Sequence, residues 1–105
     1  MDPVLASLHF RVQMAGAAIE QAVEFLGKRE VIRGRMAVQS AVFNLVAAAN
    51  SLKASGQHPD RLAYVQQLVQ FYTAQMNSVL RPAGAPTVAS ELAANQGNLL
   101  AASTV

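Results

Sequence analysis

The stretch MAVQSAVFNLVAAANSL, residues 36–52, contains no Asp, Glu, Lys or Arg. Its apolar residues recur in steps of three and four, at Val38, Val42, Leu45, Ala49 and Leu52. This spacing predicts an amphipathic helix, and such a helix normally sets a charged face against its apolar stripe. Here the outward positions carry alanine or amides, among them Gln39, Asn44 and Asn50. A face of this kind tolerates water and is easily desolvated, so it favours contact with another protein.

A second uncharged stretch, residues 62–80, repeats the pattern. Its apolar stripe is Leu62, Val65, Val69, Tyr72, Met76 and Val79, and its outward amides include Gln66, Gln67, Gln70, Gln75 and Asn77. Neither stretch resembles a membrane span of about 20 apolar residues, because both contain several amides. The chain starts without a basic segment followed by an apolar one, so we expect no signal peptide.

Composition narrows the possible functions. Charged residues make up 13% of the 105 residues, about half the usual share, and the net charge is only +2. That charge is too small to indicate a polyanionic partner. The absence of Cys excludes disulfides and thiolate metal sites and is consistent with a cytoplasmic protein.

Capping and turn residues divide the chain into helices. Asp2-Pro3 predicts the start of a first helix, which ends near Gly27 as its cap. Its apolar stripe recurs in steps of three and four, at Leu5, Leu8, Val12, Ala15, Ile19, Ala22 and Leu26. We expect a second helix over residues 30–54, stopped by Ser55-Gly56, and a third that opens at His58-Pro59-Asp60 and ends before Pro82. The predicted fold class is all-α, an antiparallel up-down bundle of three long helices plus a weaker C-terminal helix.

The predicted organisation is a three-helix core over residues 1–81, a Pro/Gly linker over residues 82–86 and a C-terminal helix or flexible tail over residues 87–105. Two prolines and a glycine fall within RPAGAP, residues 81–86, and they break helical structure. The last helix would present Val88, Leu92, Leu99 and Leu100, while Asn95 and Gly97 lower its propensity.

Each long helix carries a second apolar row besides its core stripe. These rows supply the residues that we predict to bind a partner: Phe10, Met14, Met36, Phe43, Val46, Tyr64, Leu68 and Phe71. Three helices with two apolar rows each need a cover, which is the C-terminal segment, a second subunit or a foreign helix. The sequence leaves these three possibilities open, and Phe43 and Phe71 are the expected anchors.

Residues that could carry chemistry are isolated from one another. His9 and His58 lack neighbouring ligands, and Glu20 and Glu24 lack the Glu-x-x-His pattern of di-iron bundles. We therefore expect no catalysis, no metal and no cofactor. The one concentrated charge patch is the basic corner, defined as Lys28, Arg29, Arg33 and Arg35, which Glu30 interrupts. It is open to three interpretations: a solvated turn, a contact for an acidic protein, or a phosphate contact.

Two segments carry a resemblance to a known family. Residues 16–22, GAAIEQA, resemble the Gly-Ala-Ile…Ala element of the flagellin-export chaperones, and residues 68–80, LVQFYTAQMNSVL, resemble that family's Leu-Tyr-x-Tyr-Met-x-x-x-Leu helix. The likeness covers residues 14–81, but the chain lacks the family's N-terminal Tyr- and Ser-Pro-containing segment and its C-terminal Trp. The resemblance implies a cytosolic bundle that holds the amphipathic end of a filament subunit, a mechanism shared with helical chaperones of type III secretion.

The sequence thus predicts a non-catalytic helical protein-binding module, in the form of a secretion or export chaperone or adaptor that holds an amphipathic segment. A self-associating scaffold subunit, homodimeric or larger, is the first alternative. A small nucleic-acid-binding regulator that uses the basic corner is the second.

Overall fold

The first helix, α1 (Pro3–Gly27), begins at the capping residue that the sequence predicts. In the computed structural model, which describes residues 2–104, Oδ1 of Asp2 accepts a hydrogen bond from the Val4 N–H at 2.9 Å. Pro3 follows in the first turn, where a backbone N–H would have no helical partner.

The end of α1 differs from the expected glycine cap. Gly27 is the last helical residue, and the left-handed residue is Arg29, with a φ of 62°. The Glu30 N–H donates to the Phe25 carbonyl at 2.9 Å, and the Arg29 N–H donates to the Leu26 carbonyl at 3.1 Å. These two bonds form a Schellman motif, in which an arginine occupies the position that usually favours glycine.

Short connections lead to the second and third helices, α2 (Val31–Ser55) and α3 (Pro59–Ser78). Gly56 ends α2 in a left-handed conformation with a φ of 65°, as the Ser-Gly pair predicts. Pro59 opens α3, but His58 at the N-cap position makes no capping bond with its side chain.

The C-terminal segment is helical as well. It consists of α4 (Gly84–Ala94), α5 (Gln96–Leu100) and a 3-10 turn, η1 (Ala101–Ser103). Helix α4 begins inside residues 82–86, the segment predicted from the sequence to be a linker. Pro86 is compatible with this because it lies in the first turn, where it interrupts no helical hydrogen bond. All regular structure within residues 2–104 is helical, which confirms the predicted all-α class.

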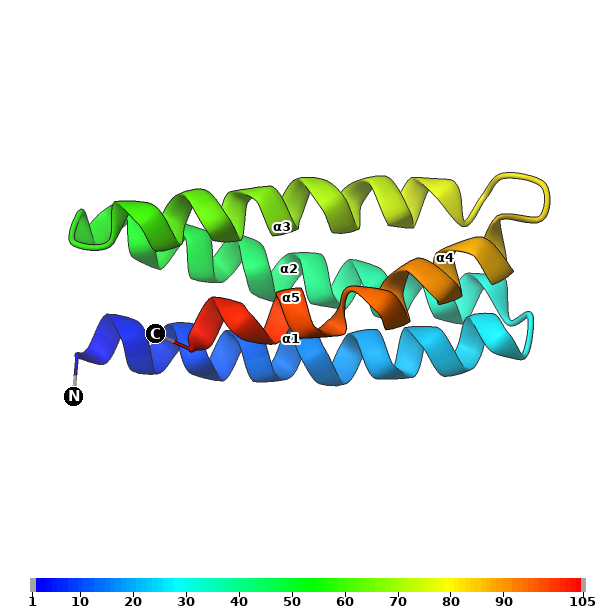
Figure 1. Ribbon diagram of the computed structural model, residues 1–105, viewed down its shortest axis with the longest axis horizontal. Coiled ribbons are helices and arrows are strands. Elements are labelled where there is room, and N and C mark those ends of the chain that lie inside the picture. Colours follow the sequence, from blue (N-terminus) through cyan, green and yellow to red (C-terminus); the bar gives the residue numbers. More distant parts are fainter. Residues whose placement is uncertain (1, 105) are drawn as a thin grey trace.

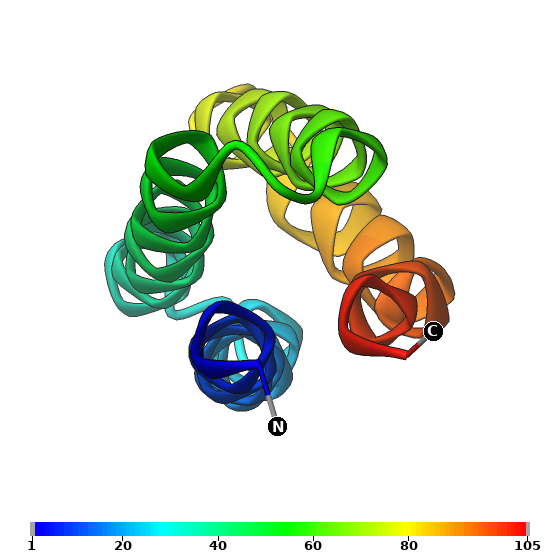
Figure 2. The same ribbon diagram turned by 90° about the vertical axis from the view of Figure 1, so that its left-hand side faces the viewer.

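The helices form an elongated bundle that measures 42 × 19 × 19 Å. Figure 1 shows α1 and α2 side by side and the C-terminal helices running back along α1 from the end of α3. Viewed along the bundle, α1, α2, α3 and the C-terminal helices surround a common centre (Figure 2). No helix within the described part of the chain combines the length and apolar character required to cross a membrane.

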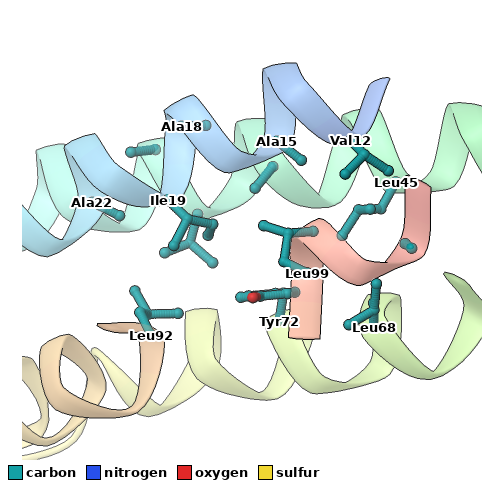
Figure 3. Packing of buried hydrophobic residues seen from close by; sticks show 14 of the residues in the cluster. Val12, Ala15, Ala18, Ile19, Ala22, Leu45, Leu68, Tyr72, Leu92 and Leu99 are labelled. Atoms are coloured by element: carbon teal, nitrogen blue, oxygen red, sulfur yellow. The ribbon is translucent and has the colours of Figure 1, made fainter. Parts of the chain in front are cut away.

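The core lies between these four walls and includes the C-terminal segment. Helix α1 contributes its predicted stripe, in which Leu8, Val12, Ala15, Ile19, Ala22 and Leu26 are all buried. Val88, Leu92 and Leu99 of the C-terminal helices are buried as completely. Figure 3 shows Leu99 next to Tyr72 of α3, and Leu92 on the opposite side of the core from Ile19 of α1. The C-terminal segment is therefore a wall of the core.

Candidate protein-binding surface

A polar contact between α1 and α2 underlies the surface with the most exposed apolar side chains. The side chain of Asn44 is buried, and its Oδ1 accepts a hydrogen bond from Nη1 of Arg11 at 3.1 Å. Its Nδ2 donates to the Ser40 carbonyl at 3.0 Å. Only the bond from Arg11 joins the two helices, so sliding one helix along the other would leave the buried Oδ1 of Asn44 without its partner. This contact therefore favours one alignment of α1 and α2.

Four large apolar side chains stand out from the same helix pair. Phe10 and Met14 of α1 are 58% and 47% exposed, and Met36 and Phe43 of α2 are 62% and 70% exposed. Phe10 and Phe43 adjoin the bonded pair Arg11 and Asn44 in sequence, so they lie at one level of the bundle. We call these four residues and the surface between them the α1–α2 face.

The centre of the α1–α2 face carries almost no charge. Residues 12–19 of α1 and residues 36–52 of α2 include no charged side chain, and Arg11 is engaged by Asn44. The four large side chains together expose on the order of 450 Å² of mainly apolar surface, which is within the range of the largest patch on a typical monomer. Patches of this size are often functional.

The other predicted partner-binding residues lie elsewhere. Val46 borders a hollow between α2 and α3, next to Val69. Leu68 is only 8% exposed and belongs to the core. Phe71 is half-buried, with its ring edge-on to Tyr72 at a centroid distance of 5.0 Å, and the Tyr64 hydroxyl donates to the Asn98 carbonyl at 2.6 Å. The predicted partner-binding residues are thus dispersed over the α1–α2 face, the hollow between α2 and α3, the core, and the side where α3 meets the C-terminal helices.

The contact between α3 and the C-terminal helices is the looser side of the bundle. A hollow of about 310 Å³ lies there, beside Tyr64, Phe71 and Asn98. Beneath it the hydroxyl of Tyr72 is buried without a hydrogen-bond partner. Burial, with a smaller contribution from Tyr64, raises the pKa of the Tyr72 hydroxyl to about 12.

We expect Tyr72→Phe to stabilise the protein by about 1 kcal/mol at pH 7, because it removes a buried hydroxyl that has no partner. The advantage of Tyr72→Phe in free energy of unfolding should grow sharply above pH 10. There the unfolded chain loses the tyrosine proton while the folded chain retains it, so the free energy of unfolding of the unmodified protein falls by about 2 to 3 kcal/mol between pH 10 and 12. Urea unfolding of both proteins at pH 7, 9 and 11 measures this. Destabilisation by Tyr72→Phe at pH 7 would show that the hydroxyl has a partner.

The basic corner is divided by acidic neighbours. Nζ of Lys28 lies 3.1 Å from Oε1 of Glu24, and Nη1 of Arg33 lies 3.6 Å from Oε1 of Glu30. Arg29 occupies the left-handed turn, and the half-buried Arg35 has its Nε turned away from solvent. Paired cations of this kind make a weak phosphate-binding surface.

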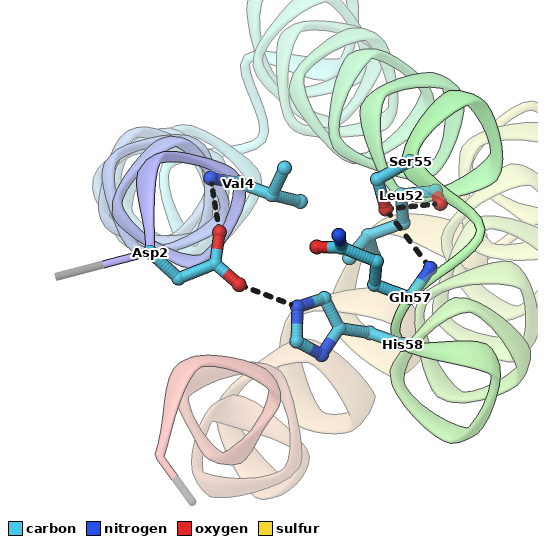
Figure 4. A network of polar contacts seen from close by, with 6 residues as sticks. All are labelled: Asp2, Val4, Leu52, Ser55, Gln57 and His58. Carbon is cyan, nitrogen blue, oxygen red and sulfur yellow. Dashed lines mark hydrogen bonds and ion pairs between the residues drawn. The ribbon is translucent and has the colours of Figure 1, made fainter.

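The two histidines differ in their surroundings. His9 is exposed on α1, whereas Nε2 of His58 lies 2.8 Å from Oδ2 of Asp2, which joins the start of α1 to the turn before α3 (Figure 4). The hydrogen bond to His58 is the main cause that lowers the pKa of the Asp2 carboxyl. This pair stabilises the fold above the ordinary carboxyl pKa, and its contribution disappears as the pH falls further. No cluster of three or more metal-ligating side chains occurs within residues 2–104.

The chain is an all-helical bundle, and comparisons with protein-family models, curated proteins and solved structures find no match to it. The likeness to flagellin-export chaperones therefore stays a prediction. Arg11 and Ser40, which connect to Asn44 beneath the α1–α2 face, were not predicted as site residues from the sequence. Asn44 itself, predicted from the sequence to face outward, is instead buried where α2 meets α1.

Proposed function

We propose that this chain is a non-catalytic protein-binding module, built as an antiparallel up-down bundle, and that it binds protein through the α1–α2 face. One observation carries the proposal. Phe10, Met14, Met36 and Phe43 remain about half exposed or more although the core beneath them is already complete. Large apolar side chains that the fold does not need are typical of interaction surfaces.

The C-terminal segment does not cover this face. It packs on another side of α1, where Nε2 of Gln96 donates to the Gly16 carbonyl at 3.2 Å and Leu100 lies close to Gly16. Covering the α1–α2 face by that segment would require it to leave Leu92 and Leu99 without their core contacts. The C-terminal helices therefore leave the α1–α2 face open to a partner.

A secretion or export chaperone is one form of this function. The resemblance at residues 16–22 and 68–80 supports it, and so does the mixture of Met and Phe on the face, since flexible Met side chains adapt to varied helical partners. A self-associating subunit is the second candidate, and the uncharged centre of the face favours it, because such a surface can pair with its own copy. Both candidates use the same surface.

A photoreactive phenylalanine analogue at position 43 tests the proposal in the cells that produce the protein. The control is the same analogue at position 80. Leu80 is a similarly exposed apolar residue in the connection between α3 and α4. We expect discrete protein adducts at position 43 and none at position 80. Mass spectrometry of the adduct distinguishes a foreign protein from a second copy. Equal patterns at both positions, or no adduct at either, would contradict the proposal.

A further inference from the structure

Both helices of the α1–α2 face carry an outward row with the spacing of a coiled coil. On α1 the row is Phe10, Met14, Ala17 and Gln21, and on α2 it is Met36, Ser40, Phe43 and Ala47. The steps are four, three and four, the spacing with which separate helices pack along a common seam. All eight side chains are at least partly exposed, so neither row is used within the bundle.

The two rows are complementary to themselves when reversed. An antiparallel copy of the α2 row sets Met36 against Ala47 and Phe43 against Ser40. An antiparallel copy of the α1 row sets Phe10 against Gln21 and Met14 against Ala17. Each large apolar side chain thus meets a smaller or uncharged one, as close packing of two helices requires.

A single twofold axis produces both reversals. The α1 row is centred between residues 15 and 16, and the α2 row between residues 41 and 42. These points lie at nearly equal distances from the connection that joins Gly27 to Val31. Both points are therefore at about the same level of the bundle. One twofold axis that lies in the face, at right angles to the helices, passes through both points and reverses both rows. An interface of this kind, with the same surface on both chains, is the commonest in homo-oligomers.

Charge gives a small preference for the antiparallel arrangement, small because Glu24 and Glu30 neutralise part of the basic corner. The basic residues Lys28, Arg29 and Arg33 all lie at the end of the α1–α2 pair where the two helices connect. A parallel dimer would bring two such corners together, whereas the antiparallel dimer moves them to opposite ends of a bundle 42 Å long. That separation exceeds the Debye length at physiological salt, so repulsion between the corners is screened.

The shape and area of the face fit a second folded copy. The hollows described above lie between α2 and α3 and between α3 and the C-terminal helices, and none of the four large side chains of the α1–α2 face lines either of them. A two-helix surface packs on another such surface, whereas a single helix is typically held in a groove. Its four large side chains supply about half of the roughly 800 Å² that each partner contributes to a standard interface, and the smaller residues between them add to this.

From these observations we infer that the α1–α2 face binds a second copy of the chain, as an antiparallel twofold dimer in which α2 packs on α2 of the other copy. The inference rests on the proposed function and names its partner. In this dimer α1 and α2 of both copies form the central four helices. The α3 and C-terminal helices of each copy lie on the outer sides, and each bundle stays intact.

Cysteine cross-linking tests the arrangement, because the chain has no cysteine of its own. In the antiparallel dimer two copies of residue 40 lie about 10 Å apart, whereas two copies of residue 51 are separated by about 28 Å along the helix axis. We expect a short bismaleimide to link Ser40→Cys efficiently and Ser51→Cys hardly at all. Linking of both variants would indicate a parallel dimer and overturn the arrangement.

The native mass in solution, by size exclusion with light scattering, decides whether the second copy binds at all. We expect a dimer that dissociates on dilution, and we expect Phe43→Gln to raise its dissociation constant about 30-fold or more, as for an interface hot spot. Leu80→Gln, at a similarly exposed site, should leave the dissociation constant unchanged. A monomer at several hundred micromolar would overturn the inference. If the protein is monomeric but the photoreactive residue at position 43 links it to a foreign protein, the proposed function stands without the dimer. If it links to nothing, both the proposed function and the dimer are wrong.

Discussion

Deletion of residues 84–105 is expected to abolish cooperative unfolding. The deletion removes Val88, Leu92 and Leu99, three side chains that are almost completely buried. Burying each of them stabilises the fold by about 1.5 to 3 kcal/mol, so the sum of about 5 to 9 kcal/mol approaches the whole stability of a small domain. The deletion also uncovers the side chains that they contact in α1 and α3. Thermal unfolding followed by circular dichroism should show a broad transition or none, where the full chain shows a sharp one.

Two point variants separate the loss of packing from the loss of chain length. Leu92 is fully buried between α1 and α3, and Leu80 is 64% exposed in the connection before α4. We expect Leu92→Ala to lower the free energy of unfolding by about 3 kcal/mol and Leu80→Ala by less than about 0.5 kcal/mol. A stable, cooperative fragment 1–83 together with a mild Leu92→Ala would show that the C-terminal helices only rest on a closed three-helix core.

The positions of the core residues were largely predictable from the sequence. On α1 the stripe from Leu8 to Leu26 is buried as its three-four spacing predicts. Asp2 and Pro3 marked the start of α1, and Gly56 marked the end of α2, because capping chemistry is local. Local signals failed at Arg29, where the turn from α1 to α2 imposes a left-handed backbone on a residue that does not favour it.

The sequence could not predict which residues of the second apolar rows are buried and which are exposed. Leu68 is buried while Phe43 is exposed, although each continues an apolar row on its own helix. The difference arises from where the fourth wall stands, since α4 and α5 pack against α1 and α3 and leave the outer side of α1 and α2 uncovered. That placement depends on contacts between residues far apart in sequence, such as Gln96 with Gly16, which periodicity does not encode.

Gly84→Ala is expected to lower the free energy of unfolding by about 3 kcal/mol. A β-carbon at this position would run into the carbonyl oxygen of Ser78 and come within 3.3 Å of the Val79 carbonyl oxygen. Both obstacles are backbone atoms at the end of α3, so they cannot rotate away as a flexible side chain does. The chain has to open the turn into α4 to make room, and this turn directs Val88 and Leu92 into the core.

The matched control is Gly97→Ala in α5, where a β-carbon would meet nothing within 4 Å. There alanine should raise stability by up to about 1 kcal/mol, because it restricts the unfolded chain and favours the helix. Opposite signs for the same chemical change, measured by urea unfolding, would show that the close backbone contact at Gly84 sets the course of the C-terminal helices. Similar effects of both variants would mean instead that helix propensity alone governs this segment, and that the turn at Gly84 can relax without disturbing the core.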